Sequence, residues 1–359
     1  MKRLVSLDFF RGLTVALMIL VNSPGSWSHV YPPLLHADWH GVTPTDLVFP
    51  FFLFIVGVSI ALAYHKKKMD GVISSSTYIK ILRRTAILFI LGLFLALFPS
   101  FDFSNLRVVG VLQRIAIVFL FCSLLFLNFN WRNQLLICIT LLLLYFIAMC
   151  YVPVPGVGKG ILEPGKNMAA WIDSFLVPGR MYQKTWDPEG FFSTLPAIST
   201  GITGLLIGQI LTNRNTSQEQ KVIWIFFGGF LTFIIGYMWG WVFPLNKHIW
   251  TSSYVLFTSG LAAMTLAASM WYIDGLNKRS YTFVGVVFGM NAIAAYVLHG
   301  VLWRIFNLGD PGLQRAFMAF YESIGVNMKL ASLFWAVFYT SLCFLFAWIL
   351  YRRKIFIKV

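Results

Sequence analysis

A histidine followed by an aspartate is the clearest candidate for chemistry in this sequence. His36 precedes Asp46 by ten residues. An imidazole can take up a proton at a useful rate near neutral pH, and the carboxylate of Asp46 or of Asp38 could hold its tautomer. Asp46 could instead have a structural role at the start of a helix, because a threonine N-cap and a first-turn proline precede it.

A second group of polar residues falls within or at the ends of apolar segments, where each needs a partner or water. Asn22 ends the first segment, and Arg114 lies about 10 Å deep in the fourth at 1.5 Å per residue. Asn291 and His299 belong to the ninth, and one continuous helix would bring them to nearly the same face. Amide and guanidinium donors of this kind could stabilise negative charge on an oxygen.

Each of these residues also has a purely structural interpretation. Arg114 could pair with an acid or with a helix-end carbonyl. Asn291 could join two helices by hydrogen bonds, and His299 could be a satisfied histidine at a helix end.

The composition excludes a water-soluble protein. Of 359 residues, 58% are hydrophobic and only 11% are charged, whereas soluble domains are nearer half apolar and a quarter charged. The sequence predicts a single all-α, polytopic membrane domain over residues 1–359. Its ten expected transmembrane segments are Gly12–Val21, Pro44–Tyr64, Tyr78–Phe98, Val108–Leu127, Leu135–Val152, Phe191–Leu211, Val222–Phe243, Ser253–Ile273, Thr282–Trp303 and Leu330–Leu350.

The basic residues predict the orientation of these segments. With a cytoplasmic N-terminus, the inner loops hold about twice as many Lys and Arg as the outer loops, including Lys66–Lys68, Lys80, Arg83 and Arg84. Both termini are therefore expected in the cytoplasm, and the formal charge of +15 needs no nucleic-acid partner. A cleavable leader is disfavoured because no small-x-small pattern follows Asn22, so we expect the mature chain to start at Met1.

Two long outer loops and four cysteines complete the organisation. The loops, near residues 23–43 and 153–190, lie on the same predicted face and favour a site that opens outward. The cysteines (122, 138, 150 and 343) lie in or beside apolar runs without metal-ligand spacing, so neither a disulfide nor a metal site is expected.

Several motifs in chain order resemble the heparan-alpha-glucosaminide N-acetyltransferase family and its bacterial relatives. The first are Arg3–Gly12 and His36–Phe52. Further blocks are Gly110–Arg114, Val152–Gly156, Asp187–Gly190, Asn246-Lys247 with Trp250 and Ser253–Val255, Gly289–Asn291 with His299, and Tyr351–Phe356. The combination is specific and spans nearly the whole chain, although the Asp-x-x-Arg-Gly element alone is common to other membrane acyltransferases.

The resemblance implies a transmembrane acyltransferase that moves acetyl from cytosolic acetyl-CoA to the amino group of a glucosamine on the far side of the membrane. His36 then corresponds to the catalytic histidine and Asn22 to a second residue of that site. Arg114, Asn291 and His299 correspond to positions that line the acetyl-CoA cavity. Two positions depart from the family pattern, His40 for a usual asparagine and Asp38 for a small polar residue, and the lumenal domain of the animal enzymes has no counterpart here.

From these residues we expect His36 to act as general base in direct transfer, with Asp46 as its partner. An acetyl-histidine intermediate and O-acetylation both stay open. The expected partners are acetyl-CoA, an amino sugar or glycan acceptor and the lipid bilayer of the inner (plasma) membrane; a homodimer is compatible with this interpretation. The main alternative is a proton-coupled secondary transporter of a small sugar, since intramembrane His, Asn and Arg would also suit a solute path. A non-catalytic scaffold would leave the outer polar cluster unexplained.

Overall fold

The computed structural model describes residues 4–71 and 73–357, and these residues are almost entirely helical. The α-helices are α1 (Val5–Asn22), α2 (Val48–Met69), α3 (Ser75–Leu97), α4 (Val111–Asn128), α5 (Trp131–Tyr151), α6 (Met168–Leu176), α7 (Phe191–Thr212), α8 (Gln218–Trp239), α9 (Ser252–Ser269), α10 (Phe283–Met290), α11 (Ala292–Phe306), α12 (Leu313–Ser323) and α13 (Met328–Arg352). Shorter elements are the 3-10 turns η1 (Pro32–Leu34) and η2 (Pro44–Leu47) and the π-helical segment η3 (Met270–Gly275). The predicted all-α fold is confirmed.

Eight helices in the described residues are long and apolar enough to cross a membrane, and α10 with α11 would form a ninth as one broken span. All ten predicted segments are helical. One predicted segment, now α3, is not among these spans, because its first half carries Lys80, Arg83 and Arg84. The two short helices α6 and α12 were not expected, because neither approaches the roughly 20 apolar residues of a span.

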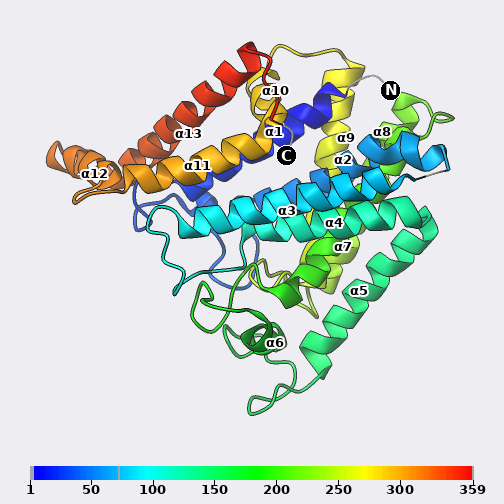
Figure 1. Ribbon diagram of the computed structural model, residues 1–359, viewed down its shortest axis with the longest axis horizontal. Coiled ribbons are helices and arrows are strands. Elements are labelled where there is room, and N and C mark those ends of the chain that lie inside the picture. Colours follow the sequence, from blue (N-terminus) through cyan, green and yellow to red (C-terminus); the bar gives the residue numbers. More distant parts are fainter. Residues whose placement is uncertain (1–3, 72, 358–359) are drawn as a thin grey trace.

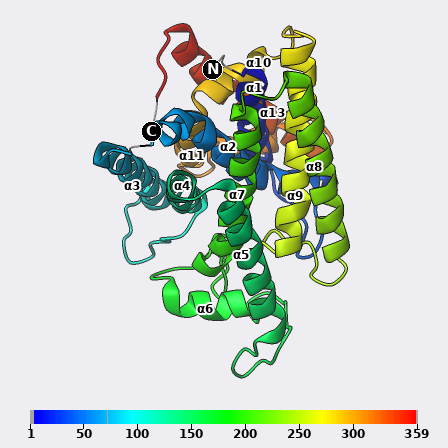
Figure 2. The same cartoon turned by 90° about the vertical axis from the view of Figure 1, so that its right-hand side faces the viewer.

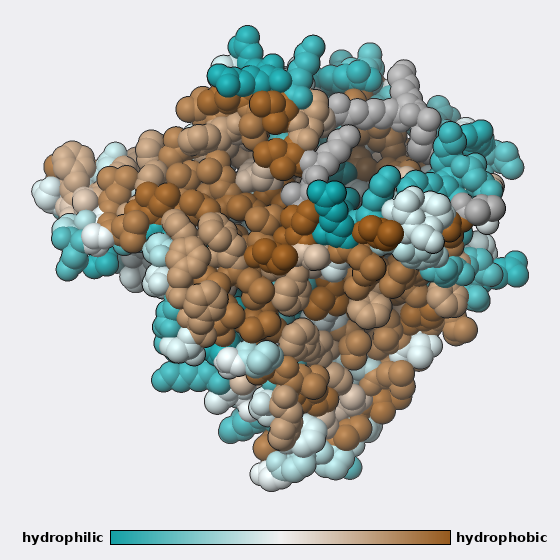
Figure 3. Space-filling model, viewed as in Figure 1, coloured by the Kyte–Doolittle hydropathy of each residue, from teal (hydrophilic) through white to brown (hydrophobic). Residues whose placement is uncertain are grey.

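The helices form one bundle with the loops gathered at one end. Figure 1 shows α2, α3 and α4 side by side across the centre, with α11 and α13 along one flank. Figure 2 shows the α8–α9 pair on the side away from α3, and α6 projecting with its loops beyond the helices. An apolar surface crosses the middle of the molecule, and hydrophilic side chains collect toward its ends (Figure 3).

Glycines let α1 and α10 pack backbone to backbone. A Cβ added to Gly12 would collide with the carbonyl oxygen of Gly285, and one added to Gly289 would collide with that of Asp8. Such close approach fixes the α1–α10 pair as a unit, since any larger side chain would push the two helices apart.

The ninth predicted segment is broken, which contradicts the expectation of one continuous helix. The axes of α10 and α11 differ by 84°, and Asn291 at the break has φ −128° and ψ 39°. Asn291 and His299 therefore do not share a helix face. The break is stabilised because the side chain of Asn291 bonds to a distant piece of backbone, and uniform hydropathy across the break conceals it in the sequence.

Candidate functional site

The loops predicted to lie on one face of the membrane do pack together. Gly41 N donates to Leu245 O at 2.8 Å, which joins the loop after α1 to the loop after α8. Trp39 Nε1 donates to Leu162 O at 2.8 Å, and its ring stacks on His248 at 5.3 Å. These contacts bring the two long loops and the α8–α9 connection into one assembly above the helix ends.

His36 and Asp46 meet within this assembly. Nδ1 of His36 lies 2.6 Å from Oδ1 of Asp46, whose residue is fully buried, while the His36 side chain is 30% exposed. Oδ2 of Asp46 accepts from the backbone N–H groups of Ala37 and Thr43, both at 3.0 Å. Asp46 thus starts η2 and also orients the imidazole, so both interpretations of this residue describe real contacts.

The sequence prediction missed Lys247 as a member of the site. Its Nζ lies 3.1 Å from Nε2 of His36 and 3.8 Å from Oδ1 of Asp46. Burial lowers the pKa of Lys247, and the charges of Asp46 and Glu189 oppose that change. Its position in the Asn246-Lys247 block was the available signal, but 211 residues separate it from His36.

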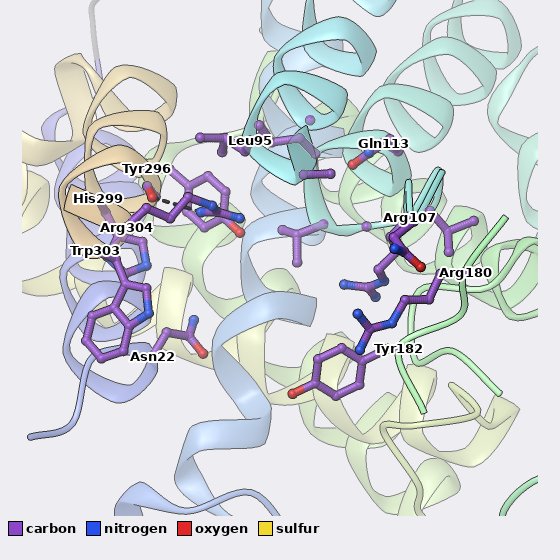
Figure 4. Close-up of a pocket in the computed structure, with 18 residues that line it drawn as sticks. Asn22, Leu95, Arg107, Gln113, Arg180, Tyr182, Tyr296, His299, Trp303 and Arg304 are labelled. Carbon is purple, nitrogen blue, oxygen red and sulfur yellow. Dashed lines mark hydrogen bonds between the residues drawn. The ribbon is translucent and has the colours of Figure 1, made fainter. Parts of the chain in front are cut away.

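A cavity of about 390 Å³, hereafter the outer cavity after the sidedness predicted from the sequence, is lined by two of the predicted residues, Asn22 and His299 (Figure 4). His299 Nδ1 lies 3.2 Å from the hydroxyl of Ser23, and the backbone oxygen of His299 accepts from Tyr339. The end of α1 and the middle of α11 therefore form one wall of this cavity.

Arg107 and Glu189 connect the outer cavity to the His36 site. Arg107, in the cavity wall, pairs with the carboxylates of Asp187 and Glu189, both at 2.5 Å. Burial alone would raise the pKa of Glu189, but the positive charges of Arg107, Arg114 and Lys247 hold it below its ordinary value. Gly190, the residue after Glu189, accepts from Nη2 of Arg114 at 3.0 Å. The Arg114 guanidinium lies 5.1 Å from the ring centre of Trp250, whose backbone N–H donates to Lys247 O at 3.2 Å. This chain of contacts joins the cavity wall to the His36 site.

Arg114 is fully buried but is not among the residues that line the outer cavity. Its Nη2 donates to Gly190 O at 3.0 Å and to Ser193 Oγ at 2.5 Å, and the guanidinium lies 5.1 Å from the ring centre of Trp250. Nε and Nη1 have no hydrogen-bond partner in the described part of the chain. These contacts fit the structural interpretation, a bond to a carbonyl at the start of α7, and donor binding by Arg114 stays a prediction.

Asn291 holds the end of the chain rather than facing a cavity directly. Its Nδ2 donates to Ile355 O at 3.1 Å, and its Oδ1 accepts from Ile357 N at 2.9 Å. The neighbouring residues 289, 290, 292 and 293, with Phe356 and Ile357, line a second cavity of about 400 Å³, hereafter the inner cavity. Arg11 and Arg84 also reach this cavity. A role of Asn291 in donor binding stays a prediction.

We expect Asn291→Ala to free the segment 355–357. Loss of both side-chain hydrogen bonds should speed hydrogen exchange of the Ile357 amide by about tenfold or more, since a bond of this kind contributes about 1 kcal/mol. Hydrogen exchange measured by mass spectrometry on C-terminal peptides checks this. Asn307→Ala is the matched control, because the side chain of Asn307 donates within its own helix end, to Trp303 O at 2.8 Å. Equal exchange in both variants would contradict the assigned contact.

Comparisons with known proteins agree with the motifs. A family model described as heparan-alpha-glucosaminide N-acetyltransferase, catalytic, matches residues 3–238. Two relatives named heparan-alpha-glucosaminide N-acetyltransferase, from Mus musculus and Homo sapiens, are 27% and 28% identical over 422 and 421 residues. The alignments cover 100% and 99% of this chain but 61% and 60% of the relatives, so the chain spans about three fifths of their length.

Proposed function

This chain belongs to the heparan-alpha-glucosaminide N-acetyltransferase family, and from that premise we propose that it is a multi-pass membrane enzyme that moves acetyl from acetyl-CoA to an amino sugar or related glycan. The observation that carries the proposal is the His36–Asp46 pair. A partly exposed imidazole held by a buried carboxylate is the arrangement that a general base needs. No metal is required for this transfer.

The proposed reaction is direct attack of the acceptor nitrogen on the thioester carbonyl. Nδ1–H of His36 donates to Asp46, so the lone pair lies on Nε2, 3.1 Å from Nζ of Lys247. The attacking amine is proposed to take the place of Lys247 at Nε2 and to give its proton to that nitrogen. The C–N bond forms, the C–S bond breaks and the CoA thiol leaves. The side-chain amide of Asn22 is the proposed donor to the developing oxyanion, a contact worth about 3–4 kcal/mol when well placed.

Acetyl-CoA is proposed to reach this site from the opposite end of the bundle through the inner cavity. Nη2 of Arg11 donates to Ser59 Oγ at 2.8 Å, and Arg84 lies over the Phe119 ring at 4.6 Å. Both guanidinium groups border the inner cavity, but Arg11 is paired with Asp8 at 3.3 Å, so Arg84 would supply most of the attraction for the phosphates of CoA. His299, on the wall of the outer cavity, is proposed to contact the acetyl end of the donor.

An assay of the purified protein in detergent distinguishes an enzyme from a transporter. The protein should transfer labelled acetyl from acetyl-CoA to glucosamine, whereas a transporter shows no chemistry without a sealed membrane. Reconstituted vesicles form the second arm of the experiment. Accumulation of a sugar by the vesicles, with no amino sugar or sugar hydroxyl labelled in detergent, would establish the transporter.

The proposed sidedness places residues 23–43 outside and Lys66–Lys68 in the cytoplasm, on the basis of the basic loops. Single cysteines introduced near His29 and near Lys67, in a variant without the native cysteines, should differ in how they react with a thiol reagent in intact cells. An impermeant thiol reagent should label only the first. The reverse labelling would invert the topology and with it the direction of transfer.

Lys247→Met should lower kcat/KM for the acceptor about tenfold, because Nζ of Lys247 lies 3.1 Å from Nε2 of His36 and helps to hold the ring that is to take the proton. Steady-state rates with the acceptor varied check this loss. Lys159→Met, at an exposed position of the long loop, is the control and should leave the rate unchanged. A wild-type rate in Lys247→Met would remove this lysine from the site.

A further inference from the structure

The outer cavity is rich in positive charge. Three arginines border it: Arg107 and Arg180 from the loop side, and Arg304 from α11 (Figure 4). Arg107 is neutralised by its pairs with Asp187 and Glu189. The positive charge that faces the cavity therefore comes from the other two arginines.

Arg304 has no carboxylate partner among the described residues. Its Nη1 donates to Gly300 O at 2.8 Å, one turn earlier in its own helix, and the residue is partly buried. A guanidinium group removed from water without an anion is costly, so such a group at a cavity wall favours an anionic ligand.

Arg180 is fixed beside this cavity by its backbone. Its N–H donates to Leu106 O at 3.1 Å, and an isolated β-bridge joins the adjacent Gly179 to Arg107. Its side chain extends into the cavity next to Arg107 and Tyr182, and no ion pair of Arg180 occurs within residues 4–71 and 73–357. The loop thus positions a second guanidinium that is available to a ligand.

We propose that the outer cavity binds an anionic group carried by the acceptor, a carboxylate, phosphate or sulfate on the amino sugar, through Arg180 and Arg304. The inference rests on the proposed function. The cavity volume, about 390 Å³, lies within the usual range for small-molecule pockets. Asn22 borders the same cavity, and contacts run from the pair Arg107–Glu189 in its wall through Arg114 to the loop that carries Lys247. An anion on the acceptor and its reacting amine would therefore lie in adjoining spaces.

The same anion site could instead take a phosphate of the donor. We assign it to the acceptor because the inner cavity offers Arg84 for the donor's phosphates, whereas the wall of the outer cavity is joined by contacts to the loop of Lys247 at the proposed base. The two sources predict different kinetics. Loss of an acceptor contact raises KM for the acceptor, and loss of a donor contact raises KM for acetyl-CoA.

The experiment compares glucosamine, glucosamine 6-phosphate and muramic acid as acceptors for the full-length protein. Wild type should prefer the two anionic sugars in kcat/KM by about a hundredfold or more, since each of the two arginines contributes about tenfold or more. Arg180→Gln and Arg304→Gln should each reduce this preference about ten- to a hundredfold, the usual loss for one charged hydrogen bond. Arg304→Lys, which keeps the charge, should retain part of it. Arg315→Gln is the control, because Arg315 pairs with Asp310 outside the cavity.

Direct binding separates this proposal from the proposed function. Calorimetry with glucosamine 6-phosphate and glucosamine should show tighter binding of the phosphorylated sugar in wild type and loss of that difference in the two glutamine variants. This result would support the anion site even if no acetyl were transferred. Equal binding of both sugars, or an unchanged acceptor preference in both variants, would overturn the proposal. A raised KM for acetyl-CoA with unchanged acceptor preference would reassign the site to the donor.

Discussion

His36→Ala is expected to lower kcat for acetyl transfer by about 10²–10⁴-fold, while acetyl-CoA should bind nearly as well as to wild type. General-base catalysis by a positioned side chain contributes a factor of this size. The side chain lies at the loop end of the bundle, 30% exposed, so its removal leaves the helix core intact. Steady-state rates and calorimetry with acetyl-CoA measure the two effects.

The matched control is His29→Ala. His29 lies in the same loop, where its Nδ1 is 3.3 Å from the hydroxyl of Ser26, and we expect near-normal rates from this variant. A comparable loss of rate in both variants would mean that the loop's conformation, rather than the imidazole of His36, supports activity.

Rapid quench of wild type with labelled acetyl-CoA and no acceptor distinguishes direct transfer from an acetyl-histidine intermediate. Direct transfer predicts no labelled protein. We favour it because the exposure of His36 would let water hydrolyse an acetyl-imidazole. Stoichiometric acid-labile label on the peptide that contains His36 would establish the two-step route instead.

Asp46→Asn should reduce kcat by about 10²–10⁴-fold, the second-largest effect expected. The asparagine oxygen can face either the backbone N–H groups of Ala37 and Thr43 or Nδ1 of His36, but not both. If the oxygen keeps the backbone contacts, the amide NH₂ donates to Nδ1. Nε2 of His36 then carries the hydrogen and can no longer act as a base.

Thermal unfolding and kinetics together test the role of Asp46. The orientation with the oxygen toward the backbone preserves both N–H contacts, so the loss of stability should be about 1–3 kcal/mol, small beside the catalytic loss. Asp38→Asn, in the same loop, is the control and should retain most activity. A variant that melts like wild type and transfers acetyl at the wild-type rate would remove Asp46 from the mechanism.

The sequence predicted those parts of the site that depend on neighbours in the chain. His36 and Asp46 are ten residues apart, and the helix-start pattern before Asp46 fixes one end of that short loop. Lys247 was not predicted as a site residue, because its contact with His36 depends on how the α8–α9 loop folds over the loop after α1. Hydropathy cannot report such a contact between loops.

The membrane-spanning segments show the same limit of prediction from the sequence: contacts between distant parts of the chain are missed. Long apolar runs predict spans well, since the bilayer demands them. The break at Asn291 was missed because the hydrogen bonds that hold its side chain run to residues 355 and 357, far away in the sequence. Arg114 was placed correctly as a buried charge, but its bonds to Gly190 and Ser193 could not be inferred from depth alone.

The shared use of the Asp46 carboxylate ties activity to local order. Its oxygens hold the first turn of η2 and the imidazole at once, so fraying of that single turn would also release His36. Local openings of this kind need less free energy than melting of the helix bundle. On warming, catalytic competence would therefore decline before the bundle unfolds, and on cooling it would return, since no membrane helix has to be rebuilt.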